Sequence, residues 1–213
     1  RLPILEQYFA FTSGGHTAIQ IADYDAFVVI GCGVGLTPLF DVYETHRSRR
    51  MTVQDQYLVS DECIIDTVSQ IYQTSTASRF IGTIRSVNKA PVFVIPDPRP
   101  SVATLDQEGS PNPIWDRYIR LVKGVHASGD GEALCDIFRR SLAPLASSGA
   151  NVIDASGTLI TQHVFTPHEF CRDSVWLQNG RYEESPNIDF FHMNAAFGAR
   201  MLKSVIENAS PGG

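Results

Sequence analysis

Residues 26–35 read Ala-Phe-Val-Val-Ile-Gly-Cys-Gly-Val-Gly, and this stretch decides the fold class. Its first five residues form a continuous apolar run rich in β-branched side chains, which Gly31, Gly33 and Gly35 then end. An apolar run without polar alternation is typical of a parallel strand that helices cover on both faces. We therefore predict a buried parallel strand at residues 26–30.

A second run of this kind covers residues 91–95 (Pro-Val-Phe-Val-Ile) and stops at the proline-rich stretch 96–100, and a shorter run follows at 151–153. Apolar residues at helical spacing lie between and after these runs. They predict helices at 56–87 with a break near 74–76, at 113–122, at 132–145 and at 195–207. Strands that alternate with long helices predict a parallel sheet flanked by helices. The predicted fold class is therefore α/β, with three α/β/α layers.

Length and charge narrow the function classes. The 213 residues are 43% apolar with a net charge of -6, which fits a single globular domain over 1–213. The basic cluster at 46–50 is short, and phosphate contacts need clustered Lys and Arg, so we expect no nucleic acid and no membrane as partners. The start Arg-Leu-Pro-Ile does not read as a signal peptide, and no run is long enough to span a bilayer. We therefore expect a cytoplasmic protein.

The strongest chemical signal is Asp189-Phe190-Phe191-His192, which directly precedes the predicted last helix. An Asp and a His three residues apart at a loop–helix junction can converge on one side. The carboxylate then fixes the imidazole tautomer, and the second ring nitrogen is left to take a proton from a nucleophile. The alternative is a plain helix start, in which Asp189 or Asn194 caps the helix and His192 has no chemical role.

The segment 189–194 (Asp-Phe-Phe-His-Met-Asn), followed by a helix with Gly198, resembles the last block of the SGNH (GDSL-type) hydrolases, which reads D-x-x-H. The run at 25–31 resembles the strand that leads into the third block of that family. The run at 91–96 resembles the strand after the next crossover. The order of these pieces suits the family from about residue 13 to the C-terminus.

This resemblance implies an α/β/α domain that hydrolyses or transfers an acyl ester, with a small molecule or a carbohydrate-linked (glycan) ester as substrate. His192 would act as general base and then as general acid, and Asp189 would orient it. Such chemistry needs a nucleophile, a base and oxyanion donors, so we expect no cofactor and no metal.

The third block departs from the family pattern. Where the family has G-x-N-D, with an Asn that donates to the oxyanion, this chain has Gly-Cys-Gly-Val-Gly at 31–35. Backbone N–H groups of Gly31 and Gly33 could supply the oxyanion donors instead. The alternative is a tight turn that needs small residues and has no catalytic part.

The first block, a strand followed by Gly-Asp-Ser or Gly-Asn-Ser, is not identifiable. Ser13 has only twelve residues before residue 26, whereas one βαβ unit takes about 30 residues. Ser13 therefore fits poorly as the nucleophile, while Gly14 fits a second-block loop near the oxyanion. We expect the first strand and its serine to lie upstream of Arg1, as a cleaved N-terminal fragment or on a partner chain that supplies the missing strand, or to be lost in a non-catalytic relative.

Two loops carry the remaining candidates. In the loop at 162–187, His168 could line the mouth of the substrate site, while His163, His168 and Glu169 match no standard zinc spacing. In the loop that follows residue 95, Asp97 and Arg99 could contact substrate, because ligands of open α/β sheets bind beyond the carboxyl ends of strands. They could equally form a surface turn among prolines.

A second class of function stays open. The chain could be a non-catalytic SGNH-like module that binds a glycan or a protein partner, which the missing serine and the missing Asn favour. A flavodoxin-like or nucleotide-binding domain ranks last, because residue 36 is Leu where a dinucleotide fingerprint needs Gly.

Overall fold

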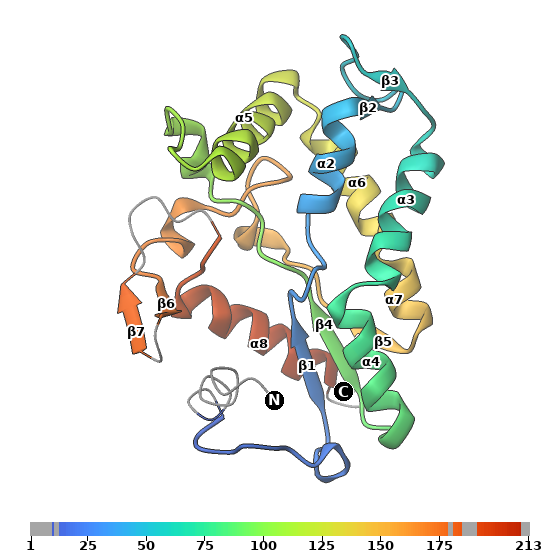
Figure 1. Cartoon of the computed structure of the whole chain (residues 1–213), viewed down its shortest axis with the longest axis vertical. Coiled ribbons are helices and arrows are strands. Elements are labelled where there is room, and N and C mark those ends of the chain that lie inside the picture. The colour runs from blue at the N-terminus through green and yellow to red at the C-terminus, as the bar shows by residue number, and fades with distance from the viewer. Residues whose placement is uncertain (1–9, 11–12, 179–180, 185–190, 210–213) are drawn as a thin grey trace.

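The computed structural model describes residues 10, 13–178, 181–184 and 191–209. Its centre is a parallel sheet of three strands in the order β1 (Phe27–Ile30), β4 (Val92–Ile95) and β5 (Ala150–Val152). Helices flank this sheet (Figure 1), which confirms the predicted three-layer α/β/α class. The strands begin within one residue of the predicted positions.

The described α-helices are α2 (Thr37–Thr45), α3 (Asp61–Gln73), α4 (Thr76–Val87), α5 (Pro113–Ser128), α6 (Gly131–Ser141), α7 (Ala143–Ser147) and α8 (Ala195–Ala209). Short 3-10 turns are η1 (Ile21–Asp23), η2 (Val102–Asp106), η3 (Gly157–Leu159) and η4 (His168–Phe170). Two small sheets complete the list, with β2 (His46–Arg47) parallel to β3 (Tyr57–Leu58), and β6 (Val175–Gln178) antiparallel to β7 (Arg181–Glu184).

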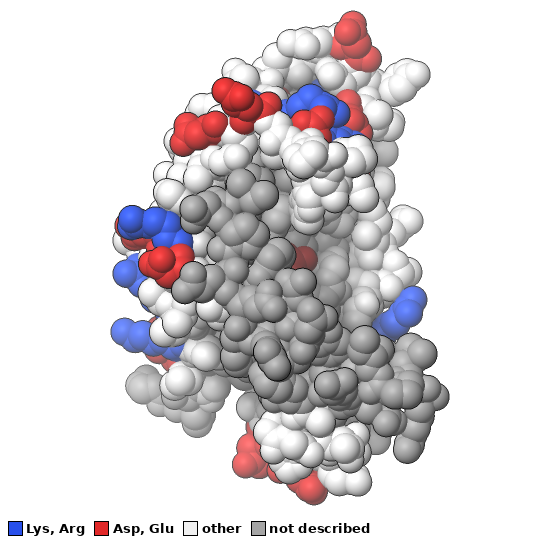
Figure 2. Space-filling model, turned by 60° about the vertical axis from the view of Figure 1, so that its left-hand side comes forward, with Lys and Arg blue, Asp and Glu red and all other residues white. Residues whose placement is uncertain are grey.

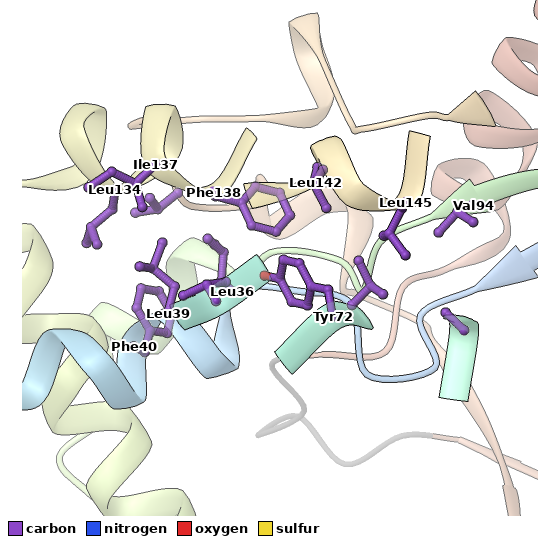
Figure 3. Close-up of a cluster of buried hydrophobic side chains, with 14 of the residues drawn as sticks. Leu36, Leu39, Phe40, Tyr72, Val94, Leu134, Ile137, Phe138, Leu142 and Leu145 are labelled. Atoms are coloured by element: carbon purple, nitrogen blue, oxygen red, sulfur yellow. The ribbon is translucent and has the colours of Figure 1, made fainter. Parts of the chain in front are cut away.

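One face of the sheet packs on a large hydrophobic core. Val29 of β1 and Val92 and Val94 of β4 meet apolar side chains from α2 through α7 on this face. Figure 3 shows the centre of this core, where side chains of α2 face those of α6 and Tyr72 of α3 lies beside them, facing Phe138. The Tyr72 ring packs edge-on against Phe138 at 6.4 Å between ring centroids, so α3 and α6 pack directly on each other.

The other face of the sheet packs on α8. Phe93 and Ile95 of β4 contact the apolar stripe of that helix, which consists of Phe197, Met201 and Val205. Figure 1 shows α8 passing across the sheet on the side away from α4 and α7. Because alternate side chains of β4 enter the two cores, this strand is buried on both faces, as predicted.

The prediction of full burial is wrong for β1. Val28 and Ile30 project to the α8 side of the sheet and are 38% and 58% exposed. Among the described residues, no strand pairs with the outer edge of β1. The apolar run at residues 26–30 therefore forms a strand, but the described chain covers the second face of this strand only in part.

Serine caps and prolines set the helix boundaries that the periodicity misplaced. The predicted helix at 56–87 begins only at Asp61, where the Ser60 side chain accepts from the Cys63 amide, and it breaks where Ser75 caps α4, as predicted. The helix predicted at 132–145 is divided into α6 and α7 near Pro144, because proline cannot donate to the preceding turn. No helix in the described part of the chain is both long and apolar enough to cross a membrane.

Candidate functional site

His192 lies in a short segment that is held on both sides by its neighbours in the chain. On its N-terminal side, the ring of Phe191 packs against Trp115 and Tyr118 of α5, with centroid distances of 5.1 and 4.8 Å. On its C-terminal side, the Met193 sulfur lies 3.5 Å from the sulfur of Cys171. The position of the exposed His192 is therefore set by packing on two different elements.

Asn194 anchors the start of α8 to the turn at η4. Its Oδ1 accepts from the amides of Ala196 and Phe197, at 3.1 and 3.2 Å, which is an N-cap. Its Nδ2 donates to the carbonyls of Glu169 and Arg172, at 2.8 and 3.0 Å. The capping role that the sequence offered for Asn194 is confirmed, and the same side chain also ties two loops together.

The turn that contains His168 is joined to the His192 segment through these bonds. The backbone N–H of Asn194 donates to the Phe170 carbonyl at 2.8 Å, so η4 and the start of α8 share a direct hydrogen bond. The His168 side chain is exposed beside this junction. The structure thus brings the loop segments of His168 and His192 together, although they are separated by more than twenty residues.

The glycine-rich turn after β1 has a backbone that only small residues favour. Gly31, Cys32 and Gly33 have φ of 65°, 56° and 85°, so three successive residues are left-handed. The turn is held from three sides, by Tyr72 Oη donating to the Gly35 carbonyl at 2.5 Å, by the Ala77 amide on the Cys32 carbonyl at 3.1 Å and by the Asp97 amide on the Val34 carbonyl at 2.6 Å. These hydrogen bonds therefore fix the conformation of the turn at the carboxyl end of the sheet.

The amide groups of this turn differ in what they donate to. The Gly31 N–H already donates to the Ile95 carbonyl of β4 at 2.7 Å, which continues the sheet ladder. The amides of Cys32, Gly33 and Gly35 donate to no acceptor among the described residues. Of the two predicted oxyanion donors, the Gly31 N–H is therefore used by the sheet, whereas the Gly33 N–H has no acceptor among the described residues.

Asp97 sits against this turn, directly after β4. A Cβ atom placed on Gly31 would overlap the Oδ1 atom of Asp97, and one on Gly35 would lie 2.7 Å from the Asp97 Cβ. Because Gly31 and Gly35 have no side chains, they leave the space that the Asp97 carboxyl group occupies. The residue Asp97 as a whole is exposed to solvent. Its carboxyl group is partly buried against the turn, and this burial raises the pKa of the group.

Cys32 is the one nucleophilic side chain within the glycine turn. Burial and the negative charge of Asp97 both raise the pKa of its thiol. Since the thiolate is the reactive form, these surroundings disfavour Cys32 as a nucleophile. The residue is better explained as part of the turn, where its small side chain packs against the main core.

Tyr118 links the His192 segment to the glycine turn. Burial raises the pKa of its phenol, the nearby charge of Asp97 raises it further, and a hydrogen bond with Thr37 opposes the rise. Thr37 is the first residue of α2, directly after the turn. The aromatic cluster of Trp115, Tyr118 and Phe191 was not predicted from the sequence, although Trp and Tyr three residues apart after Pro113 are a helical pair that could have indicated it.

The remaining predicted site residues lie elsewhere. Asp189 is outside the described residues. Gly14 lies in the segment before η1 and β1, and a Cβ atom placed on it would meet no atom within 4 Å, whereas one on Gly33 would meet Ser75. Ser13 donates to the carbonyl of His16 at 2.8 Å.

Arg99 is held by contacts inside the fold. It is buried and pairs with Asp154 at 2.8 Å, on the loop after β5, and its guanidinium lies 5.9 Å from the centre of the Phe138 ring. This buried ion pair joins the loops after β4 and β5. In the described part of the chain, no group of three or more His, Cys, Asp or Glu side chains could hold a metal ion.

Comparison with known proteins gives no relative. No family model, no curated protein and no solved structure matches this chain. The function must therefore be argued from the arrangement of residues alone.

Proposed function

We propose that this chain is the acid–base part of an SGNH-type serine hydrolase that acts on an acyl ester, with His192 as the proton carrier and Asp189 as its orienting carboxylate. The observation that supports this proposal most is the anchoring of His192. Packing by Phe191 and capping by Asn194 fix an exposed imidazole beside elements at the carboxyl end of the sheet. Ligands of open α/β sheets bind at that end.

The proposed reaction uses these groups in two steps. His192 takes the proton of a serine hydroxyl as its oxygen attacks the ester carbonyl, and it returns that proton to the alcohol that leaves. Water then attacks the acyl-serine carbonyl as it gives a proton to His192, and His192 returns that proton to the serine oxygen as the bond between this oxygen and the acyl carbon breaks and the acid leaves. Amides of the turn after β1, including that of Gly33, would stabilise the oxyanion of both tetrahedral intermediates.

The serine would come from outside the recognisable sequence, on a strand beside β1. Two observations support a further strand at this place, the outer edge of β1 that no described strand pairs with and the exposed Val28 and Ile30 next to it. A parallel strand seated there would end beside Gly31. An N-terminal fragment or a partner chain would supply it.

The second candidate is a non-catalytic module that binds a glycan or a protein. The capping role of Asn194 favours it, because a cap alone accounts for a well-ordered start of α8. In this case His192 has no proton to carry, and the region around the glycine turn serves only to bind.

Labelling with a fluorophosphonate separates the two candidates, because this reagent forms a covalent bond with an activated serine. We would treat the full-length gene product that contains this chain, its His192→Ala variant and a His126→Ala control, in which an exposed histidine of α5 is removed. We expect one adduct by intact mass, retained in His126→Ala and lost in His192→Ala, with the modified serine mapping outside residues 1–213. No adduct on the wild type, or an adduct that persists without His192, would contradict the hydrolase.

A further inference from the structure

Cys171 and Met193 bring two sulfur atoms together at the junction between η4 and α8. The Cys171 thiol donates to the Met193 thioether, with 3.5 Å between the two sulfur atoms. Cys171 is 7% exposed, yet it belongs to neither of the two apolar clusters that the described residues form, whereas Met193 packs at the edge of the α8 core. Packing into a core therefore explains the place of Met193 but not that of the thiol that faces it.

The backbone around both sulfur atoms is fixed by one residue. Asn194, which directly follows the methionine, donates from its backbone amide to the Phe170 carbonyl. Its Nδ2 donates to the carbonyls of Glu169 and Arg172. These three carbonyls lie on both sides of Cys171 in the chain. The separation of the two sulfur atoms is therefore set by hydrogen bonds between their neighbours, which is the preorganisation that a ligand site requires.

The turn η4 adds a nitrogen donor to the two sulfur atoms. His168 and Cys171 are three residues apart, and the Cys171 amide donates to the His168 carbonyl at 3.0 Å, which closes the turn. Side chains three residues apart in a 3-10 turn lie on the same side of it, so the exposed imidazole of His168 shares a side with the Cys171 thiol. Among the described residues no three His, Cys, Asp or Glu side chains gather as metal ligands, and it is the thioether of Met193 that completes this set.

The softness of these donors, rather than charge, selects the ligand. Figure 2 brings the side of β6 and β7 forward, and along its left edge basic and acidic side chains lie next to one another, so the charge on this face is mixed. Thiolate and thioether sulfur atoms together favour Cu(I), and imidazole is a further ligand that copper accepts. Zn(II) sites use thiolate, imidazole and carboxylate ligands but not thioethers. One nitrogen and two sulfur atoms of this kind therefore point to Cu(I).

We propose that His168, Cys171 and Met193 form a binding site for Cu(I). On binding, the S–H bond of the thiol breaks, its proton passes to solvent, and the sulfur forms a bond with the metal ion, which keeps its oxidation state. The negative thiolate balances the charge of Cu(I), so the complex brings no net charge into this partly buried junction. The exposed His168 and the half-buried Met193 leave the site open to solvent on one side. Ester hydrolysis needs no metal, so this site has a role of its own.

Competition with the Cu(I) chelator bicinchoninate, on the 213-residue chain kept reduced with ascorbate, measures the affinity of this site. We expect one tightly bound Cu(I) per chain. Met193→Leu should weaken binding at least about tenfold, because leucine keeps the volume but has no sulfur. Cys171→Ser should weaken it further, since the thiolate is lost, and His168→Gln should weaken it as well. The matched controls are Met51→Leu, which removes a buried thioether of the main core, and Cys63→Ser, which removes an exposed thiol of α3. Both should bind Cu(I) as the wild type does.

X-ray absorption at the copper edge identifies the donor atoms without any substitution. We expect two sulfur neighbours and one nitrogen neighbour in the wild type, and the loss of one sulfur in Met193→Leu. The proposal is overturned by unchanged affinity in Met193→Leu, by loss of tight binding in Cys63→Ser, or by Zn(II) that binds more tightly than Cu(I). If a variant of the site fails to fold, the wild-type spectrum decides, and fewer than two sulfur neighbours contradicts the site. None of these measurements uses ester hydrolysis, so a failure of the proposed hydrolase leaves this test unaffected.

Discussion

Asp130 and Asp97 are two acids in contrasting surroundings. Asp130 precedes α6 and is 4% exposed, but both of its oxygens are satisfied, by the Tyr43 hydroxyl at 2.7 Å and by the Thr52 amide at 2.9 Å. The Arg47 guanidinium covers the Tyr43 ring at 3.2 Å from its centre and adds a nearby positive charge. This network ties α2, the segment after β2 and the start of α6 together.

Asp97 is more accessible and has none of these partners among the described residues. The difference indicates what each acid does to stability. A carboxylate that is matched by buried donors stabilises the fold, whereas Asp97, to which no described residue donates, is destabilised in its ionised form by burial against the glycine turn. Removing the two acids should therefore have opposite effects on stability.

The largest effect is expected from Asp130→Ala. This change leaves the Tyr43 hydroxyl and the Thr52 amide without an acceptor next to a buried Arg47. We expect a loss of about 3 kcal/mol in the free energy of unfolding, since breaking a buried charged network by one partner is costly. Thermal unfolding should show a melting temperature roughly 6–12 °C lower. A variant as stable as the wild type would mean that the contrast between the two acids is wrong.

The close approach of the Asp97 carboxyl group to Gly31 can be tested by a double-mutant cycle that combines Gly31→Ala with Asp97→Ala. The new Cβ would overlap the Asp97 carboxyl group and would also force a non-glycine residue to φ of 65°. In the Asp97→Ala background only the backbone cost remains. We therefore expect a coupling of about 1–2 kcal/mol from urea unfolding of the four proteins. Strictly additive losses would show that Gly31 is not kept small for Asp97.

The Asp130 network can be probed more gently through Tyr43→Phe, which removes a single hydroxyl. We expect a loss of about 1 kcal/mol near neutral pH. Burial, and then the bond to Asp130, raise the pKa of Tyr43 from 10.0 to about 12. The protonated phenol is thus favoured by folding, so the advantage of Tyr over Phe should decline as the pH rises from about 10 through about 12. Urea unfolding of both proteins across this range measures the decline, and a constant difference would contradict it.

The smallest effect is expected from Asp97→Asn. Because burial raises the pKa of Asp97 above 3.8, its ionised form is disfavoured in the folded state and costs stability above that pKa. Removing the charge should raise the melting temperature at pH 7, by no more than about 2 °C since the group is partly solvated. The gain should shrink as the pH falls towards 4. A lower melting temperature at pH 7 would mean that Asp97 has a stabilising partner.

Local patterns predicted the layers of this fold but not every boundary. The apolar runs at 26–30 and 91–95 became β1 and β4, and the last helix follows its apolar stripe from Ala195. The helix α2 was missed because it begins with Thr37 and Pro38 directly after the glycine turn, where the sequence reads as a loop. The exposure of β1 was missed because an apolar run gives no information on whether a covering element is present.

The candidate site was predictable only where its residues are close in sequence. His192 and Asn194 stand together at a helix start, so spacing alone indicated them. The aromatic cluster joins Phe191 to residues of α5 that lie more than seventy positions earlier, and the burial of Asp97 against the glycine turn arises only in the folded chain. Local sequence patterns do not contain such tertiary contacts. The sequence therefore leaves two interpretations of Asp97 open, a substrate contact and a surface turn.

The proposal that His192 carries the proton is tested most directly by steady-state hydrolysis of an acetyl ester by the full-length gene product and its His192→Ala variant. We expect kcat/KM to fall by at least about 10³ in His192→Ala, as when the base of a serine hydrolase is removed, with an unchanged melting temperature. An active wild type whose rate survives the loss of His192 would contradict the proposal.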